Sequence, residues 1–288
     1  NSTNLSAAAL AVLLRHKGVQ AICALLDYGP HGGGHGHYDK LNLMLYAHGR
    51  EWLLDPGRLN YRHKEYHSWV KHTAAHNTVA IDSTSQRATT GKMIWWNVQP
   101  EFTACAATCD SAYPNIKLAR YLFLCDTFLA DVFTVEAAEE SQIDWFAHAD
   151  GRELVPAGES VESVPIDLGN YPGYRHLSAA RSYRQPGETR WSFVAGKDKR
   201  LSVWCPTVKG EQVISTVGIG YTIDAKVPCL LRRRSGKRTS FATVYDLSDD
   251  GNTVRRVVTD DAQPLRMAVE TTDEKWRLDF AERTFAKN

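Results

Sequence analysis

The chain concentrates its histidines in one short region, where their spacing could support metal binding or proton transfer. Eight of the eleven histidines lie between His31 and His76. The richest stretch contains His31, His35, His37 and Asp39, separated mainly by glycines. Glycine permits backbone conformations with positive φ and leaves room for a ligand close to the main chain. If the chain is extended from His35, then His35, His37 and Asp39 share one face, where two imidazoles and a carboxylate converge.

Two further side chains could complete a metal site with this cluster. Asp55 follows the apolar run 51–54 and precedes a Pro-Gly turn, and His76 lies just before the stretch 78–81. Both positions are expected strand ends, where a sheet fixes the direction of a side chain. Imidazoles and carboxylates at such positions are typical zinc ligands, although spacing alone leaves other divalent metals open.

Short β-like runs separated by turns must position these side chains. The runs are rich in valine, isoleucine, threonine and aromatic residues. They cover residues 19–26, 41–47, 51–54, 78–81, 102–107, 118–125, 128–135, 144–148, 191–195, 201–204, 229–233, 239–245, 253–258, 266–270 and 275–280. Many strands at short spacing predict an all-β antiparallel sandwich over residues 1–288. A division into a main sandwich, 1–215, and a smaller terminal sheet, 216–288, is an alternative.

Three segments have less certain patterns. Residues 5–15 are rich in alanine and leucine, which favours a helix, but a hairpin strand is also possible. Residues 151–190 contain glycine, proline and polar clusters and are expected to form a long loop region. The basic run 232–234 is interpreted as a solvated strand end, with a polyanion contact as the alternative.

Composition excludes several classes of protein. The chain has 34 basic and 33 acidic residues, a net charge of +1, which argues against a general nucleic-acid binder. No apolar run approaches the roughly 20 residues that span a bilayer. None of the six cysteines forms a CxxC pair, so a thiolate zinc site is not expected.

Four segments together carry a family resemblance. They are the string Asp-Tyr-Gly-Pro-His-Gly-Gly-Gly-His-Gly-His-Tyr-Asp-Lys-Leu at 27–41, Leu-Asp-Pro-Gly at 54–57, Ala-His-Asn-Thr-Val at 75–79, and Gln86. In order and rough spacing they resemble the signature of the heparinase II/III-like polysaccharide lyases, which include heparinases and oligoalginate lyases. The resemblance implies an N-terminal (α/α) toroid followed by antiparallel β-sheet layers. Only the β part is similar here, so we expect a missing N-terminal toroid domain.

The resemblance also implies a role for each side chain of the cluster. His35 is expected to face the substrate as a catalytic residue. His37, Asp55 and His76 are expected to bind a structural zinc ion that holds the loops presenting His35. Asp39 is expected to accept a hydrogen bond from the ring N–H of one of these imidazoles.

Further residues are candidates for catalysis and substrate binding. Some family members place a tyrosine after the aspartate ligand, and Tyr61 is favoured here over Tyr66 for that catalytic role. Substrate-binding candidates for an anionic sugar are His31, Arg58 and Tyr66.

The implied reaction is β-elimination at a uronic acid. A base removes the proton at C5, next to the carboxylate, and an acid protonates the O4 leaving group. The expected partner is an anionic polysaccharide or oligosaccharide, of alginate or glycosaminoglycan type. The resemblance implies a periplasmic or secreted location, and the chain, which opens without a signal peptide, is interpreted as a mature, processed or partial form.

Two other functions remain open from the sequence. One is a non-catalytic carbohydrate-binding or structural module that keeps the zinc. The other is a cupin-like metal enzyme, because an HxH motif with a carboxylate and a later histidine also fits a redox metal site. Cupin metal ligands have a different spacing, which makes this the weaker alternative.

Overall fold

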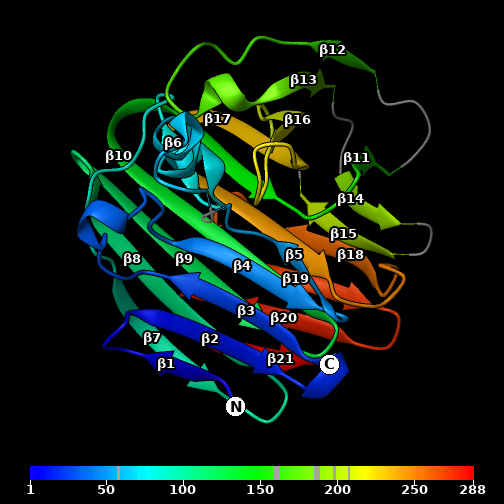
Figure 1. Cartoon of the computed structure of the whole chain (residues 1–288). Coiled ribbons are helices and arrows are strands. Elements are labelled where there is room, and N and C mark those ends of the chain that lie inside the picture. Colours follow the sequence, from blue (N-terminus) through cyan, green and yellow to red (C-terminus); the bar gives the residue numbers. More distant parts are fainter. Residues whose placement is uncertain (57–58, 158–161, 185–188, 197–198, 207) are drawn as a thin grey trace.

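Three antiparallel β-sheets stack as layers in this chain, which we describe from a computed structural model (Figure 1). The structure describes residues 1–56, 59–157, 162–184, 189–196, 199–206 and 208–288. Within these residues, a central twelve-stranded sheet has a five-stranded sheet on one side and a four-stranded sheet on the other. The prediction of an all-β, multi-layer antiparallel sandwich is confirmed.

The strands form from stretches of β-branched, aromatic and aliphatic residues. The five-stranded sheet contains β1 (Thr3–Leu5), β2 (Leu10–Arg15), β3 (Ile22–Asp27), β4 (Asn42–Ala47) and β5 (Arg50–Leu53). The main path of the central sheet contains β11 (Glu153–Pro156), β14 (Thr189–Gly196), β15 (Lys199–Cys205), β17 (Lys226–Asp246), β10 (Phe128–His148), β9 (Ile116–Leu124), β8 (Thr103–Tyr113) and β7 (Lys92–Val98). Its branches are β6 (Val79–Ile81), β12 (Ser163–Pro165), β13 (Ser178–Tyr183) and β16 (Gln212–Ile219). The four-stranded sheet contains β18 (Val254–Thr259), β19 (Arg266–Thr271), β20 (Lys275–Asp279) and β21 (Thr284–Lys287).

Hydrophobic cores fill the two spaces between the layers. Side chains alternate along β9 and β10, so that Leu122 and Phe133 pack toward the five-stranded sheet. Their neighbours Phe123 and Val132 pack toward the four-stranded sheet. All four side chains are fully buried. A third cluster, around Trp69, packs helical turns against β10, β16 and β17.

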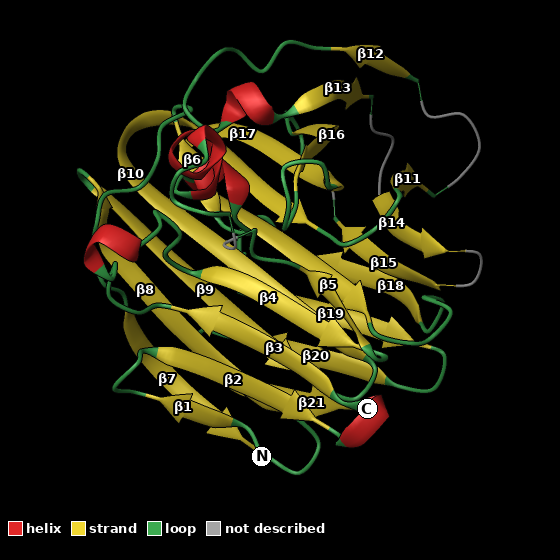
Figure 2. Cartoon of the chain, in the orientation of Figure 1, coloured by secondary structure: helices red, strands yellow, loops and turns green. Residues whose placement is uncertain are grey.

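The helical elements are single turns within loops (Figure 2). They are η1 (Gly18–Gln20), η2 (Gly33–His35), the π-helical turn η3 (Tyr66–Val70), η4 (Thr73–Ala75) and η5 (Tyr174–His176). Turns η3 and η4 lie beside β6, close to the end of the central sheet that carries β13 and β16 (Figure 2). Among the described residues, no helix has the length and apolar character that a membrane crossing requires.

The structure resolves the ambiguous segments of the sequence. Residues 5–15 form the β1–β2 hairpin instead of a helix, because Ala11 and Leu13 alternate into the core. The long-loop prediction for 151–190 is wrong in its described part, which contains β11, β12, β13 and the start of β14. These strands are short and largely exposed, so they lack a clear alternating pattern. The alternative division after residue 215 falls inside β16, and the separate sheet starts at Val254.

Strands β10 and β17 are the two long paired strands of the central sheet that position the loops of the site. Each has 21 residues, and the two pair along nearly their whole length, with a register shift between Glu136 and Ser141. The first half of β10 pairs with β9, whereas residues 143–145 pair with β6. Because β6 starts three residues after His76, this pairing fixes one end of the segment that carries His76.

Candidate metal centre and active site

Glycines fold the histidine-rich loop between β3 and β4 into a tight turn. Gly32 and Gly33 have positive φ angles, 78° and 68°, and the chain then forms η2. Gly36 lies against the backbone of His31, where a Cβ atom at position 36 would be 1.4 Å from the His31 carbonyl oxygen. Only glycine fits there without a shift of the loop.

This turn separates side chains that an extended strand would have kept on one face. His35 is exposed, whereas His37 is half-buried and Asp39 is buried. The expectation of a single strand face is therefore wrong, because the segment from η2 to β4 is irregular. The loop instead presents His35 outward and directs His37 and Asp39 toward the other two segments of the cluster.

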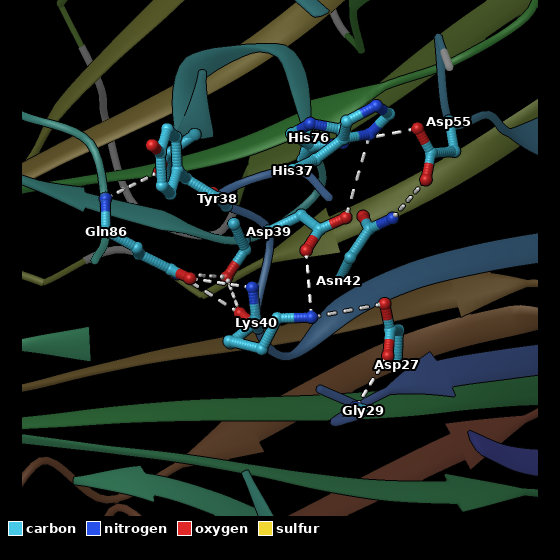
Figure 3. A network of polar contacts seen from close by, with 12 residues as sticks. Asp27, Gly29, His37, Tyr38, Asp39, Lys40, Asn42, Asp55, His76 and Gln86 are labelled. Carbon is cyan, nitrogen blue, oxygen red and sulfur yellow. Dashed lines mark hydrogen bonds and ion pairs between the residues drawn. The ribbon is translucent and has the colours of Figure 1, made fainter. Parts of the chain in front are cut away.

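The three segments meet in one group of potential metal ligands (Figure 3). His37, Asp39, Asp55 and His76 each offer one ligand atom, and these atoms all lie within 4.8 Å of one another. His76 Nδ1 is 3.3 Å from Asp55 Oδ1, and the rings of His37 and His76 have centroids 5.2 Å apart. The structure thus brings together the three side chains for which a shared metal was expected.

Hydrogen bonds orient the two candidate ligands His76 and Asp55. His76 Nε2 donates to the Val70 carbonyl oxygen at 2.8 Å, which leaves Nδ1 with a lone pair in the neutral ring. Asp55 Oδ2 accepts a hydrogen bond from Asn42 Nδ2 at 3.2 Å. Asp55 Oδ1 and His76 Nδ1 are buried and have no hydrogen-bond partner among the described residues. Two facing acceptors in a buried site fit a bound cation.

The charges of the cluster also fit a bound cation. Burial and the neighbouring His76 lower the pKa of His37, so this ring is neutral near pH 7. Burial also opposes a charge on His76, but Asp55 outweighs burial and raises the pKa of His76 to about 9. Burial raises the pKa of Asp55, but His76 outweighs it and the net shift is downward. A proton shared by this pair occupies the place that a divalent cation would take.

Asp39 lies between His37 and the buried Lys40 (Figure 3). Its Oδ2 is 3.9 Å from His37 Nδ1, which is longer than a hydrogen bond, and its Oδ1 is 3.0 Å from Lys40 Nζ. Lys40 is only 2% exposed and also lies 3.5 Å from Asp27 Oδ2. Burial opposes the lysine's charge, but Asp39 and Asp27 raise the pKa of Lys40. Asp39 can therefore serve as a ligand or as a partner of His37, and its role stays a prediction.

Asn77 connects the segments that carry the cluster, a role that the sequence analysis missed. Its Nδ2 donates to the carbonyl oxygens of Leu43 and Leu54 at 2.8 and 2.9 Å. Its Oδ1 accepts the backbone N–H of His148 at 2.6 Å. Leu54 directly precedes Asp55, and Asn77 directly follows His76. The side-chain amide of Asn77 therefore holds the backbone beside both candidate ligands. The only sequence signal was the position of Asn77 within the family-like string at 75–79.

A second group of side chains forms an exposed pair beside the cluster. The Tyr61 hydroxyl lies 2.5 Å from His35 Nδ1, and Tyr61 is 53% exposed. The ring of Tyr66 packs edge-on beneath Tyr61, with centroids 4.7 Å apart. Tyr66 is 2% exposed and its hydroxyl has no partner among the described residues. Burial, and then Tyr61, raise the pKa of Tyr66.

The substrate-binding candidates have different surroundings. Tyr66 is too buried to contact a substrate in this conformation, and it instead supports Tyr61. His31 is half-buried, its ring lies 5.0 Å from that of Tyr38, and its Nε2 is buried without a partner among the described atoms. Arg58 lies outside the described residues.

Comparisons with known proteins give consistent results. Residues 3–182, more than half of the chain, match the family model described as heparinase II/III-like, C-terminal. An alginate lyase of Stenotrophomonas maltophilia is 30% identical over 173 residues, which are 51% of this chain and 23% of the relative. An exo-oligoalginate lyase of Saccharophagus degradans is 27% identical over 250 residues, which are 75% of this chain and 34% of the relative.

A solved structure shows the same fold. The heparan sulfate lyase of Pedobacter heparinus matches with a TM-score of 0.70 at 14% sequence identity, over 96% of this chain and 42% of its own. The chain therefore spans a quarter to a third of the two alginate-lyase relatives and less than half of this structural neighbour.

Proposed function

Because the chain belongs to the heparinase II/III-like family, as a C-terminal domain of these polysaccharide lyases, we propose that it is the zinc-binding β-domain of an enzyme that cleaves uronic-acid polysaccharides by β-elimination. The proposal rests mainly on one arrangement. Three distant segments bring His37, Asp55 and His76 together. The ring of Tyr66 connects this group to the exposed His35–Tyr61 pair, since its centroid lies 6.1 Å from that of His37 and 4.7 Å from that of Tyr61.

The metal-binding residues hold the loops in this proposal, and they do not take part in the reaction. His37, Asp55 and His76 would be the ligands, with Asp39 as a candidate fourth. When bound, zinc supplies a cross-link between these three segments in addition to their hydrogen bonds. Because His37 is two residues from His35, holding His37 also fixes the direction of His35.

The exposed pair performs the proton transfers. His35 Nδ1, 2.5 Å from the Tyr61 hydroxyl, accepts the phenolic proton and so makes Tyr61 a base. Tyr61 then removes the C5 proton of the uronate, and the electron pair left on C5 forms the C4–C5 double bond. The C4–O4 bond breaks, and Tyr61 passes the proton to O4. Tyr61 suits this role better than Tyr66, whose hydroxyl is buried.

We propose alginate-type uronates as the first substrates to test. The two sequence relatives are named alginate lyase and exo-oligoalginate lyase, whereas the heparan sulfate lyase shares only 14% of residues. We also propose that a helical N-terminal domain completes the substrate cleft, because the relatives and the structural neighbour are more than twice as long as the matched region. A periplasmic or secreted location stays a prediction.

The proposal is tested by incubating the full-length protein with alginate, heparan sulfate and a neutral glucan. The expected result is ultraviolet absorbance from the new C4–C5 double bond with a uronate polymer only. His35→Ala is expected to abolish this signal while the fold and the bound zinc are retained. Sugar binding without unsaturated product would instead indicate a non-catalytic module, and iron or manganese in the site would favour the cupin-like alternative.

A further inference from the structure

A cavity far along the sequence from the histidine cluster is lined by basic side chains. It has a volume of about 560 Å³ and is formed by the loop before β16, the middle of β17 and the loop after β18. Its charged lining residues are Lys209, Arg233, Arg234, Arg238 and Asp261. None of the cavity's lining residues belongs to the metal cluster or to the His35–Tyr61 pair. Its size is in the range of small-ligand sites.

Arg233 and Arg234 of the basic run 232–234 line this cavity, and the prediction that the run is a solvated strand end is wrong. The run lies inside β17, and Arg232 is 0% exposed. Arg232 and Arg234 both bind Glu211, with Arg234 Nη2 2.7 Å from Glu211 Oε2. Arg233, which also lines the cavity, binds Asp144 through Nε and Nη2, both at 2.7 Å. These carboxylates hold the guanidinium groups in fixed directions, so less side-chain conformational entropy is lost when a ligand binds.

Positive charge exceeds negative charge around the cavity. Three guanidinium groups share the two carboxylates of Glu211 and Asp144. Lys209 and Arg238 are exposed and have no ion-pair partner among the described residues. Asp261 is the carboxylate that lines the cavity itself. The cavity therefore has uncompensated positive charge.

Unused hydrogen-bond donors accompany this charge. Arg233 uses Nε and Nη2 for Asp144, and its Nη1 has no partner among the described residues. Arg234 is 9% exposed, and its buried Nε is likewise without a partner there. Burial, and then the charge of Arg232, lower the pKa of Arg234, as expected where cations crowd. Each of these nitrogens can donate a charge-assisted hydrogen bond to an oxyanion, which is stronger than a hydrogen bond to a neutral acceptor.

We propose that this cavity is a second glycan-binding site, which takes one oxyanion-bearing sugar unit of an acidic polysaccharide. The preference for an oxyanion follows from the cavity alone, whereas the choice of a sugar rests on the proposed function. The anion is a uronate carboxylate or a sugar sulfate, which present the same acceptor chemistry. Such a site would hold a long polymer at a distance from the bond that is cleaved.

Binding to the full-length protein tests this proposal. The variant Lys209→Ala/Arg238→Ala removes two exposed cations of the cavity, and Lys92→Ala/Arg152→Ala removes two exposed cations elsewhere as a matched control. Both are made in the His35→Ala background, so that binding is measured without turnover. Calorimetry uses an oligouronate of about ten units, a sulfated glycosaminoglycan oligosaccharide, a neutral glucan and inorganic phosphate.

The cavity variant is expected to bind an acidic oligosaccharide about tenfold more weakly than the control at low salt, with unchanged thermal unfolding. The better of the two acidic ligands identifies the anion as carboxylate or sulfate. With His35 restored, turnover of a uronate disaccharide or trisaccharide should be unchanged in the cavity variant. Equal binding by the cavity variant and the control would overturn the proposal, as would phosphate or neutral glucan binding as tightly as the acidic sugars. Failure of the proposed lyase activity would leave these binding results interpretable, because they need no turnover.

Discussion

Among single residues, His76 and Asp55 decide the chemistry of the site, because their facing atoms require a cation or a proton between them. His76 Nδ1 and Asp55 Oδ1 face each other at 3.3 Å, and the Val70 carbonyl takes the hydrogen on the other ring nitrogen. Without a cation, a proton must lie between the two acceptors. For this reason Asp55 raises the pKa of His76 to about 9. Metal binding therefore competes with a proton.

This competition makes a prediction about pH. In the metal-free chain, His76 stays protonated up to pH 9, whereas an unfolded histidine loses its proton near pH 6.5. The stabilisation from this pair is full below pH 6.5 and is lost as pH rises through 9, by up to about 3 kcal/mol. Chemical denaturation of the metal-free protein between pH 6 and 9.5 measures this fall. The same titration with zinc should show the opposite trend, with about one proton released per ion near pH 7. Stability of the metal-free chain that is flat over this range would contradict the assignment.

Gly36 makes a prediction with a neighbouring control. Gly36→Ala would place a Cβ 1.4 Å from the His31 carbonyl oxygen, so the loop must move and displace His35 and His37. We expect loss of zinc and at least a roughly 100-fold lower turnover, measured by metal analysis and ultraviolet absorbance. Gly34→Ala meets no atom within 4 Å and should leave both unchanged. Equal behaviour of the two variants would show that the close approach at position 36 does not matter.

The two tyrosines are distinguished by conservative substitutions. Tyr61→Phe removes the hydroxyl that contacts His35 and should lower turnover about 100-fold to 10,000-fold with little change in stability. Tyr66→Phe removes a buried hydroxyl without a described partner and should keep activity within about tenfold. Steady-state rates on a uronate oligosaccharide, with thermal unfolding as the control, separate the two roles. A larger loss from Tyr66→Phe would reverse the assignment.

At the scale of elements, the site is held by hydrogen bonds between segments that are distant in the sequence. Asn77 connects β4, the end of β5 and the end of β10 through one side chain. Arg120 on β9 is fully buried, and its Nη1 donates to the carbonyl oxygens of Leu41 and Asn77 at 2.7 and 2.5 Å. Asp131 on β10 holds the other edge of this guanidinium. The sheet thus supports both loops from below.

Asn77→Ala tests this connection. The change leaves two carbonyl oxygens and one N–H without partners in a fully buried position, so we expect a loss of about 3 kcal/mol or more. Zinc affinity should fall as well, because the backbones of Asp55 and His76 are released together. Asn97→Ala, at a half-buried position of β7, should change the free energy of unfolding by less than about 0.5 kcal/mol. Similar losses in both variants would argue against a special role for Asn77.

The sequence predicted many of the strands, but it missed β7, β11, β12, β13, β16 and β21 and divided two long strands. The halves of β10 and β17 were predicted as separate strands, because exposed residues such as Glu139 and Lys237 interrupt the apolar pattern at the bend. Strands β11, β12 and β13 were missed, because they are short and mostly exposed and gain their stability from partners far along the chain. The β1–β2 hairpin was ambiguous, since alanine and leucine suit helices equally well.

The candidate site was predictable as a set of residues but not as a geometry. The types and order of His37, Asp55 and His76 suggested a shared ion, and the structure brings them together. The resemblance implied that His35 faces the substrate, but the turn that separates it from His37 and Asp39 was not predictable from strand alternation, because the turn depends on the contact of Gly36 with His31. The support from Asn77 and Arg120 was also hidden, because a buried polar residue has no signature until its partners are known.

At the scale of the whole molecule, the layers explain why the loops gather at one place. Two cores hold three sheets together, and the third cluster around Trp69 packs the helical turns next to the candidate metal ligands. The basic cavity lies on other elements, the middle of β17 and the loops beside it. In the account proposed here, one part of the β-domain presents the catalytic pair and another holds the acidic polymer.

Metal analysis of the purified full-length protein decides whether the histidine cluster binds an ion. We expect one zinc ion per chain, retained in His35→Ala and lost in His37→Ala, with the His37 variant also unfolding at a lower temperature. A wild-type protein that binds no stoichiometric divalent metal, or a His37→Ala variant that keeps its ion at full affinity, would contradict this expectation.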